Sequence, residues 1–528
     1  MPLGIAAIPP PERGAMTAAK APDALEEPRS SAPSTEQAAS ADWVIWLIAS
    51  AVFGCYTTLS VFRYLRLQPT TYDLGIFTEY VRQYSLLHAP FVGISRMDLL
   101  GEHFHPILAI LAPLFRLFPT SVTLLVVQAL LVALSVVAIS RVATVRLGAA
   151  SGRLIGAAYG FSWGLQQLIN FDFHEVAFAI PLIALSLSAL IDSPRHPAVD
   201  IPERRAPRYK AAVLWALPLV LVKEDQGFTV AAIGLLLALH YRHRIAGSLL
   251  AAWGLTWSVL AITVIIPHFN PSHQYPYWSQ GGQLSDGRAQ LTVPDLIHNL
   301  VAYPSAKLPT LALILLPTVF LALRSPLILV AVPGLLLRFV STDSAYWGTT
   351  WHYNATVMPI VFLAAIDAIT RIRASEDHFD GGASLARRTQ NAVWTPMARY
   401  GPAMMIAVAA ALSFQFPLAA LWNPQTFQID QHVAAARAAM ALVPDDTTVE
   451  TDMDLLASLA ARDQVFWFGT PNNPATRYIV FDATSTDYQP PPNNVPAFIA
   501  SLHPKRRYTL IYDHHGVYVF RLFGIQRN

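Results

Sequence analysis

The sequence is poor in cysteine and in charged residues. Cys55 is the one cysteine among 528 residues, which excludes a disulfide within the chain and a zinc site made of cysteines. Charged residues make up 13% of the chain, whereas soluble proteins carry about a quarter. Hydrophobic residues make up 54%, and the mean hydropathy is +0.40. A succession of soluble domains is therefore excluded for most of the length, and we expect an integral membrane protein.

The motifs of several enzyme classes are missing as well. The chain has no glycine-rich phosphate loop, dinucleotide-binding fingerprint, serine nucleophile elbow or zinc-protease pattern. We expect no nucleic-acid partner. Residues 1–41 are rich in Pro, Ala, Ser and Glu and have no basic start leading into an apolar run. We therefore predict a disordered cytoplasmic tail there, and not a signal peptide.

Long apolar runs alternate with shorter polar segments between residues 42 and 421. A bilayer core of about 30 Å needs about 20 apolar residues per helix, and shorter or broken helices are tolerated inside a bundle. The runs predict a polytopic α-helical membrane protein with about 11 transmembrane helices. These are expected at 43–62, 120–140, 153–170, 176–192, 211–222, 227–241, 245–266, 308–323, 326–341, 354–371 and 401–421.

The apolar run 104–118 is short and is interrupted by Pro113. Cytoplasmic loops are enriched in Arg and Lys, and the basic clusters fall on one side of the membrane only if this run does not cross. We therefore expect a re-entrant or interfacial helix on the outer face, a cytoplasmic N-terminus and an external C-terminus. The basic clusters lie at 141–153, 204–210, 242–244 and 371–388.

Three long segments then lie outside the membrane: the first external loop 63–119, the loop 267–307 and residues 422–528. The last of these alternates strand-like and helix-like runs, which predicts a small external α/β domain. The strand-like runs are 464–469, 477–482 and 508–522 around a His-His-Gly turn, and the helix-like runs are 429–443 and 453–461. An Ala-rich chain with few lysines is typical of a GC-rich bacterial genome, so we expect a bacterial plasma membrane.

This topology places nearly every unusual polar residue on the outer side. Ionisable groups at membrane depth are costly and usually mark a functional site. The candidates are Asp73, Glu79, Asp98, Glu102, His103, His105, Asp172, His174, Glu175, Lys223, Glu224, Asp225, Trp351 and His352.

Each candidate also has a purely structural interpretation. Asp73 can cap a helix over 74–88. His103 and His105 share a face only on an extended segment, where they can bind a metal or a phosphate, or simply pack at the interface. The turn 172–175 can be polar because interfacial turns usually are.

Three further segments have two interpretations each. Lys223–Asp225 joins two short apolar helices, and we favour a role for Lys223 in binding an anionic headgroup or phosphate. Asp452 and Asp454 form a carboxylate pair, but we favour the end of a strand and a helix cap. Aromatic rings in the loop 267–307 can stack on sugars or, as we favour slightly, form an interfacial belt. They include Tyr275, Tyr277 and Trp278.

The run Tyr72–Phe77, followed by Glu102–Pro106 and an apolar helix with proline, resembles a bacterial membrane family, the domain-of-unknown-function family 2079. Phe171–Glu175 and Lys223–Asp225 also resemble its pattern. That family is similar in plan to the C-type glycosyltransferases, which are multispanning bundles with an essential acid in a long first external loop. They take a sugar from a polyprenyl-phosphate carrier at the outer leaflet.

The resemblance implies that Asp73 occupies the position of the catalytic acid. No second acid follows it directly, and the nearest is Glu79. We expect a membrane glycosyltransferase that moves a hexosyl or pentosyl group from a polyprenyl-phosphate donor to an acceptor hydroxyl, with Asp73 as general base. Lys223, Arg82 or Arg96 would bind phosphate.

The other candidates are expected to surround the substrates. His103, His105, His174 and Glu175 would position the donor or hold a divalent metal. Substrate contacts are also expected from Glu79, Asp172, Glu224, Asp225, Trp351 and His352. The alternatives are a secondary transporter or lipid flippase, and a non-catalytic member of the same fold. The long first external loop, the external domain and the lack of visible inverted repeats argue against a transporter.

Overall fold

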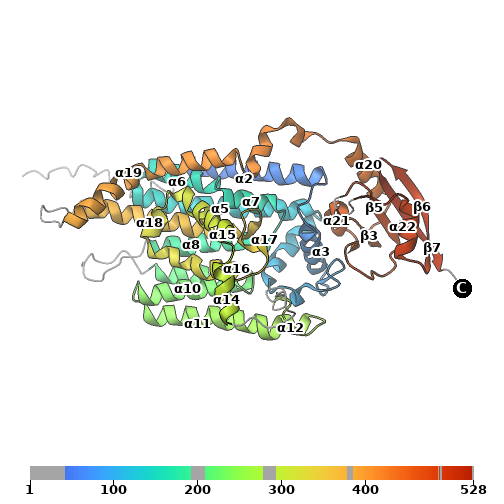
Figure 1. Cartoon of the computed structure of the whole chain (residues 1–528), viewed down its shortest axis with the longest axis horizontal. Coiled ribbons are helices and arrows are strands. Elements are labelled where there is room, and N and C mark those ends of the chain that lie inside the picture. The colour runs from blue at the N-terminus through green and yellow to red at the C-terminus, as the bar shows by residue number, and fades with distance from the viewer. Residues whose placement is uncertain are drawn as a thin grey trace, which may run out of the picture.

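The computed structural model describes residues 42–191, 208–277, 293–376, 385–485, 487 and 490–525. The expected tail 1–41 and Trp278 lie outside these residues. The molecule is elongated: a bundle of helices fills one end, a β-sheet with its helices lies at the other, and α3 lies between them (Figure 1).

The helices of the bundle and its outer loops are α2 (Trp43–Leu65), α3 (Asp73–Ser85), α4 (Ala112–Leu117), α5 (Ser121–Leu147), α6 (Ala149–Gly160), α7 (Trp163–Asn170), α8 (Ala179–Ile191), α9 (Tyr209–Ala216), α10 (Gln226–Leu239), α11 (Arg244–Leu260), α12 (Ile266–Phe269), α14 (Val293–Val301), α15 (Pro304–Leu315), α16 (Val332–Phe339), α17 (Ser344–Trp347), α18 (Val357–Glu376) and α19 (Leu385–Ser413). Short 3-10 turns precede several of them, including η2 (Pro106–Leu111), η3 (Glu175–Phe178), η4 (Leu217–Leu221) and η8 (Pro326–Ala331).

Four of the described helices are long and apolar enough to cross a membrane: Trp43–Leu65, Ser121–Leu147, Arg244–Phe269 and His352–Ala374. The pair Val293–Val301 and Pro304–Thr318 makes a fifth if the two helices, bent by 69°, form one span. Further apolar helices have only 10–17 residues, and one of them, Pro106–Leu117, lies in the apolar run 104–118. The chain is thus a helical protein with at least four apolar spans.

Two glycine pairs bring α10 and α11 into close contact. A Cβ on Gly227 would lie 2.3 Å from the carbonyl oxygen of Gly254, and one on Gly234 would lie 2.6 Å from that of Gly247. Small residues at these crossings let the two backbones touch, as is common between membrane helices. The crossing fixes the N-terminal end of α10, which directly follows the Lys223–Asp225 turn.

The C-terminal segment forms the expected α/β domain. Its sheet has the strand order β4-β3-β5-β7-β6, in which β3 pairs in parallel with β4 and β5, and β7 pairs antiparallel with β5 and β6. The elements are α20 (Gln431–Met440), β3 (Thr448–Thr451), α21 (Met453–Ala460), β4 (Gln464–Trp467), β5 (Tyr478–Asp482), α22 (Val495–Leu502), β6 (Arg506–His514) and β7 (Val517–Ile525).

The C-terminal domain is packed tightly on α3 and the first external loop. A Cβ on Gly75 would lie 3.1 Å from Cβ of Leu456, and the Ser121 hydroxyl donates to the carbonyl oxygen of Ala457 at 2.5 Å. A Cβ on Gly93, which follows β1 (Phe91–Val92) of the β1–β2 (Met97–Asp98) hairpin, would lie 2.4 Å from the carbonyl oxygen of Val465. One hydrophobic core therefore runs from the bundle into the domain.

Candidate functional site

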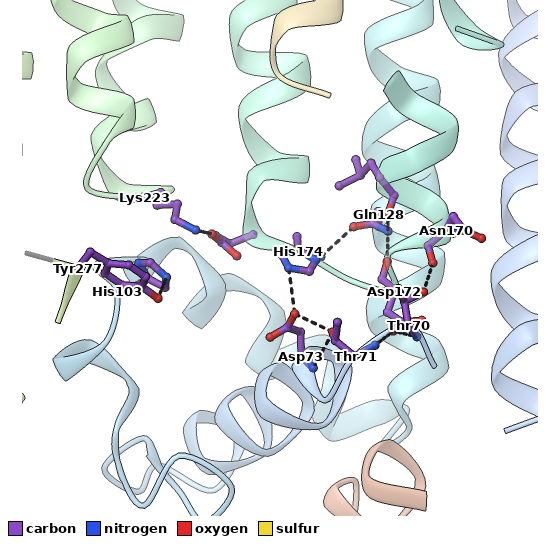
Figure 2. Close-up of polar contacts among 12 residues, drawn as sticks. Thr70, Thr71, Asp73, His103, Gln128, Asn170, Asp172, His174, Lys223 and Tyr277 are labelled. Atoms are coloured by element: carbon purple, nitrogen blue, oxygen red, sulfur yellow. Dashed lines mark hydrogen bonds and ion pairs between the residues drawn. The ribbon is translucent and has the colours of Figure 1, made fainter. Parts of the chain in front are cut away.

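Asp73 is the first residue of α3. The structure does not support the capping interpretation, because the cap position is Tyr72, and the Asp73 carboxylate accepts from the Thr71 hydroxyl at 2.7 Å. Its Oδ2 also lies 3.5 Å from Nε2 of His174 (Figure 2). The carboxylate remains 26% exposed. Burial raises the pKa of Asp73, but His174 and the Thr71 hydroxyl outweigh it, so the pKa is lowered and the ionised form is favoured at neutral pH.

The turn that carries Thr71 and Asp73 is held by Asp172. The Asp172 carboxylate accepts from the backbone N–H of Thr70 at 2.8 Å and of Thr71 at 3.4 Å. Burial raises the pKa of Asp172 to about 6. Gln128 of α5 accepts from the backbone N–H of His174 at 3.0 Å and donates to the carbonyl oxygen of Asp172 (Figure 2). Asp172 is therefore placed to position the Asp73 turn.

Arg63, in the last turn of α2, supports the same turn from the other side. Its guanidinium donates at 2.8 Å to Oδ1 of Asn170 and at 2.8 Å to the Thr70 hydroxyl. Arg63, Thr71 and Gln128 were not among the site residues predicted from the sequence. A buried amide in the middle of the apolar run 120–140 was the one available signal for Gln128.

Lys223 and Glu175 form an ion pair near the contact between Asp73 and His174. The Lys223 ammonium lies 2.9 Å from Oε1 of Glu175, and their side chains are 15% and 1% exposed. In Figure 2 the Lys223 ammonium points toward the space between His103 and His174. A buried ion pair leaves a large desolvation cost if one partner is removed, so each of the two charges requires the other.

Glu224 is paired with the first external loop. Its Oε1 lies 2.7 Å from Nδ1 of His103 and accepts from the Tyr275 hydroxyl at 3.1 Å. Its Oε2 accepts from the backbone N–H of Phe104 at 3.1 Å. The other ring nitrogen of His103 lies 2.7 Å from the Tyr277 hydroxyl. The neighbouring residues Lys223 and Glu224 thus have different partners. Lys223 pairs with Glu175 of η3, and Glu224 binds His103, Phe104 and Tyr275.

A stack of rings closes the site behind His174. The His352 ring lies on that of His174, with ring centroids 3.7 Å apart, and Trp351 packs edge-on against Phe171 at 4.4 Å. Arg338 holds the backbone of this loop by donating to the carbonyl oxygen of Tyr353 at 3.1 Å. His352 is therefore placed next to His174, the partner of Asp73.

Three of the expected substrate-binding residues are turned toward the C-terminal domain. Glu79 is fully buried and accepts from the backbone N–H of Gly93 at 3.0 Å. Arg82 forms an ion pair with Asp446 at 2.7 Å. Arg96 donates to the carbonyl oxygen of Pro471 at 2.9 Å. The structure does not gather these three side chains with Asp73.

His105 is also separate from the polar contacts. It is 1% exposed, and its ring packs edge-on against Phe77 and Tyr80 at 5.9 and 5.1 Å. Burial lowers the pKa of His105 to about 3, so the ring is neutral. Within the described residues, no three His, Cys, Asp or Glu side chains are arranged to hold a metal ion. The charge of Glu175 acts on His103, His105 and His174, but Glu175 pairs with Lys223 and His103 pairs with Glu224.

The Asp452 carboxylate does not cap α21, contrary to the sequence interpretation. It follows β3 as expected and occupies the cap position, but it makes no capping hydrogen bond. Its Oδ2 accepts instead from the backbone N–H of Asp482 at 2.5 Å. The first N–H of α21, that of Met453, donates to Asp487 at 2.8 Å.

Comparison with solved structures shows the fold. The chain is similar to ArnT from Cupriavidus metallidurans bound to undecaprenyl phosphate, with a TM-score of 0.54 and 14% identity over 90% of this chain and 97% of that one. It is similar to the apo state of the same protein with a TM-score of 0.52, also at 14% identity, over 91% and 98% of the two chains.

Comparison with sequences shows the family. No curated protein sequence matches the chain. The family model described as "Predicted membrane protein (DUF2079)" matches residues 63–494, which include every element of the site. The chain belongs to this family of membrane proteins.

Proposed function

We propose that the protein is an integral membrane glycosyltransferase of the C type, which transfers a sugar from a polyprenyl-phosphate donor to an acceptor hydroxyl on the outer face. The observation that carries the proposal is the setting of Asp73. An exposed, ionised carboxylate at the start of a helix lies beside His174 and near a Lys223–Glu175 pair. The likeness of fold to a protein that binds undecaprenyl phosphate supports the donor class.

Asp73 acts as the general base in this proposal. The acceptor oxygen attacks the anomeric carbon, the bond from that carbon to the phosphate oxygen breaks, and the phosphate leaves with the electron pair. The acceptor proton passes to the Asp73 carboxylate. Positioned proton removal of this kind contributes on the order of 10²–10⁴-fold to the rate. Thr71 and His174 hold the carboxylate in its orientation.

The positive charge of Lys223 stabilises the departing phosphate. Fixed cations in a site of low dielectric stabilise developing negative charge without reorganisation. Lys223 is a single ammonium and is already paired with Glu175. When a phosphate binds, the Lys223 ammonium interacts with the phosphate as well as with the Glu175 carboxylate. The proposed topology, with about 11 spans and an external C-terminus, places all of these groups at the outer leaflet.

The test compares two Asp→Asn variants in cell membranes that contain the protein and their own acceptors. Labelled polyprenyl-phosphate hexoses and pentoses are supplied, and release of polyprenyl phosphate is measured. Asp73→Asn should lower release by about 100-fold or more with an unchanged thermal unfolding midpoint. The matched control is Asp430→Asn, because Asp430 caps α20 and Asn caps equally well.

Near wild-type release by a folded Asp73→Asn protein would remove Asp73 from the mechanism. Movement of the labelled lipid across the bilayer of vesicles, without loss of its sugar, would contradict the transferase and favour a flippase.

A further inference from the structure

Glu224 joins two external segments that are far apart in the sequence. Its side chain is 2% exposed. Both of its carboxylate oxygens are occupied, by His103 and Phe104 from the first external loop and by Tyr275 from the loop after α12. A carboxylate with three donors is held firmly, and it is a strong acceptor because it is charged. Glu224 therefore fixes the position of the His103 ring.

His103 lies between an acid and a phenol. Its Nδ1 is 2.7 Å from Glu224, and its Nε2 is 2.7 Å from the Tyr277 hydroxyl. The His103 and Tyr277 rings are also stacked, with centroids 4.6 Å apart and planes inclined by 19°. Glu224, His103 and Tyr277 thus form one hydrogen-bonded series that ends at the Tyr277 oxygen. The His103 side chain is 19% exposed.

The direction of the hydrogen bond between His103 and Tyr277 depends on one proton. The Glu224 carboxylate can only accept, so Nδ1 of His103 carries hydrogen in either state. In neutral His103, Nε2 is an acceptor and Tyr277 must give its hydroxyl hydrogen to it. In the imidazolium, Nε2 donates to the Tyr277 oxygen, and the Tyr277 hydrogen becomes available to another acceptor. Protonation of His103 therefore creates a hydrogen-bond donor at Tyr277.

The charges around His103 favour the imidazolium. Burial lowers the pKa of His103, but the negative charge of Glu224 outweighs it, and the pKa is raised. Lys223 opposes this effect and Glu102 adds to it. The titratable and charged groups that face the His103–Tyr277 pair are Glu102 and His105 of the first external loop, Glu175 of η3, Lys223, Glu224 and Asp225 of the turn before α10, and Tyr275 and Tyr346.

An anionic ligand needs more positive charge than Lys223 supplies here. Lys223 is paired with Glu175, and Glu102, Glu224 and Asp225 also lie close to it. Carboxylates thus outnumber the permanent cations among these groups. A phosphodiester can bind with a balanced charge only if a neutral group takes up a proton.

We propose that Glu224, His103 and Tyr277 form a proton-linked phosphate subsite, in which His103 becomes or remains an imidazolium and the Tyr277 hydroxyl donates to a phosphate oxygen beside Lys223. This inference rests on the proposed function, since it identifies how the site recognises the phosphate of the donor. His103 and Glu224 are positioning residues in this subsite, and Tyr277 is the contact.

The test measures binding of a short polyprenyl methyl phosphodiester to the purified full chain by calorimetry between pH 5.5 and 9. This probe carries one negative charge that does not titrate in that range. Wild type should take up close to one proton per ligand at high pH, seen as a difference between buffers of unequal ionisation enthalpy. Its Kd should rise about tenfold per pH unit above the pKa of His103.

Tyr277→Phe should bind at low pH about tenfold or more weakly than wild type, because a hydrogen bond to a charged group is lost. His103→Gln should show no proton uptake. The matched control is Tyr400→Phe, because Tyr400 lies in α19, is 58% exposed and takes no part in these contacts. It should keep both the proton uptake and the pH dependence. Thermal unfolding checks that each variant is folded.

Binding without proton uptake, uptake retained in His103→Gln, or wild-type affinity of Tyr277→Phe at low pH would overturn the subsite and leave the proposed function standing. No binding by wild type at any pH would contradict both. Proton-linked binding by a protein without transfer activity would support the subsite and contradict only the transferase.

Discussion

Helix α3 carries two acids about two turns apart, and they lie in opposite kinds of surroundings. Asp73 faces the outer end of the bundle, is partly exposed, and is bound by a hydroxyl and an imidazole. Glu79 faces the C-terminal domain, is fully buried, and accepts from the backbone N–H of Gly93. Side-chain partners can rotate or exchange protons. A backbone N–H can move only if the surrounding fold moves with it. The first setting suits chemistry and the second suits docking.

The largest effect on the docking face is expected from Gly93→Ala. The new Cβ would lie 2.4 Å from the carbonyl oxygen of Val465 in β4, and a backbone atom in a sheet cannot move aside cheaply. Overpacking of this kind costs about 1–3 kcal/mol or more. We expect a lower thermal unfolding midpoint and faster proteolysis of the C-terminal domain. Gly54→Ala in α2 is the control, since nothing lies within 4 Å of the added atom.

A medium effect on the thermal unfolding midpoint is expected from Glu79→Gln, and it appears only when the midpoint is measured as a function of pH. Burial raises the pKa of Glu79 to about 8 and outweighs the hydrogen bond from Gly93. The folded protein thus holds a proton that the unfolded chain releases near pH 4.5, so Glu79 makes stability fall as pH rises from about 4.5 to about 8. Glu79→Gln mimics the protonated acid. Its unfolding midpoint should fall less than that of wild type between pH 5 and 8.5, and an equal slope in both proteins would exclude Glu79 as the cause.

The smallest effect is expected from Arg82→Ala. Its ion-pair partner Asp446 is 83% exposed, and exposed pairs contribute about 0–1 kcal/mol. We therefore expect stability within about 1 kcal/mol of wild type and release of polyprenyl phosphate close to wild type. A large loss of release with normal stability would restore Arg82 to the phosphate site that the sequence predicted and would break the distinction between the two faces of α3.

The sequence identified several of the residues that lie close to Asp73 in the structure. Charge at the ends of apolar runs identifies Asp73, His174 and Lys223 because such residues are rare near a membrane. It does not identify their partners. Lys223 pairs with Glu175 and its neighbour Glu224 with His103, and nothing in a single sequence distinguishes these pairings from others. The partners of Arg82 and Glu79 could not be predicted for the same reason: they are Asp446 of the C-terminal domain and the backbone N–H of Gly93.

The fold was predictable where the pattern is long. The runs 43–62 and 120–140 correspond to α2 and α5, although α5 extends to Leu147. The run 153–170 is in fact two helices, α6 and α7, separated at Phe161 and Ser162. Strand β3 was predicted only by its end at Asp452, because four residues carry too little periodicity to define a strand's length. Its parallel pairing with β4 and β5 depends on distant partners.

The docking of the last domain on the first external loop also sets the order of assembly. The loop 63–119 is synthesised long before residues 446–471, whose contacts with Arg82, Gly93 and Arg96 complete it. Until those contacts form, Glu79 lacks the burial that raises its pKa to about 8, so we expect it to take up a proton as the domain docks. This face of α3 is therefore covered only after residues 446–471 have been synthesised, with the slow kinetics of contacts between distant parts of a chain. A chain that stops before these residues leaves the face uncovered.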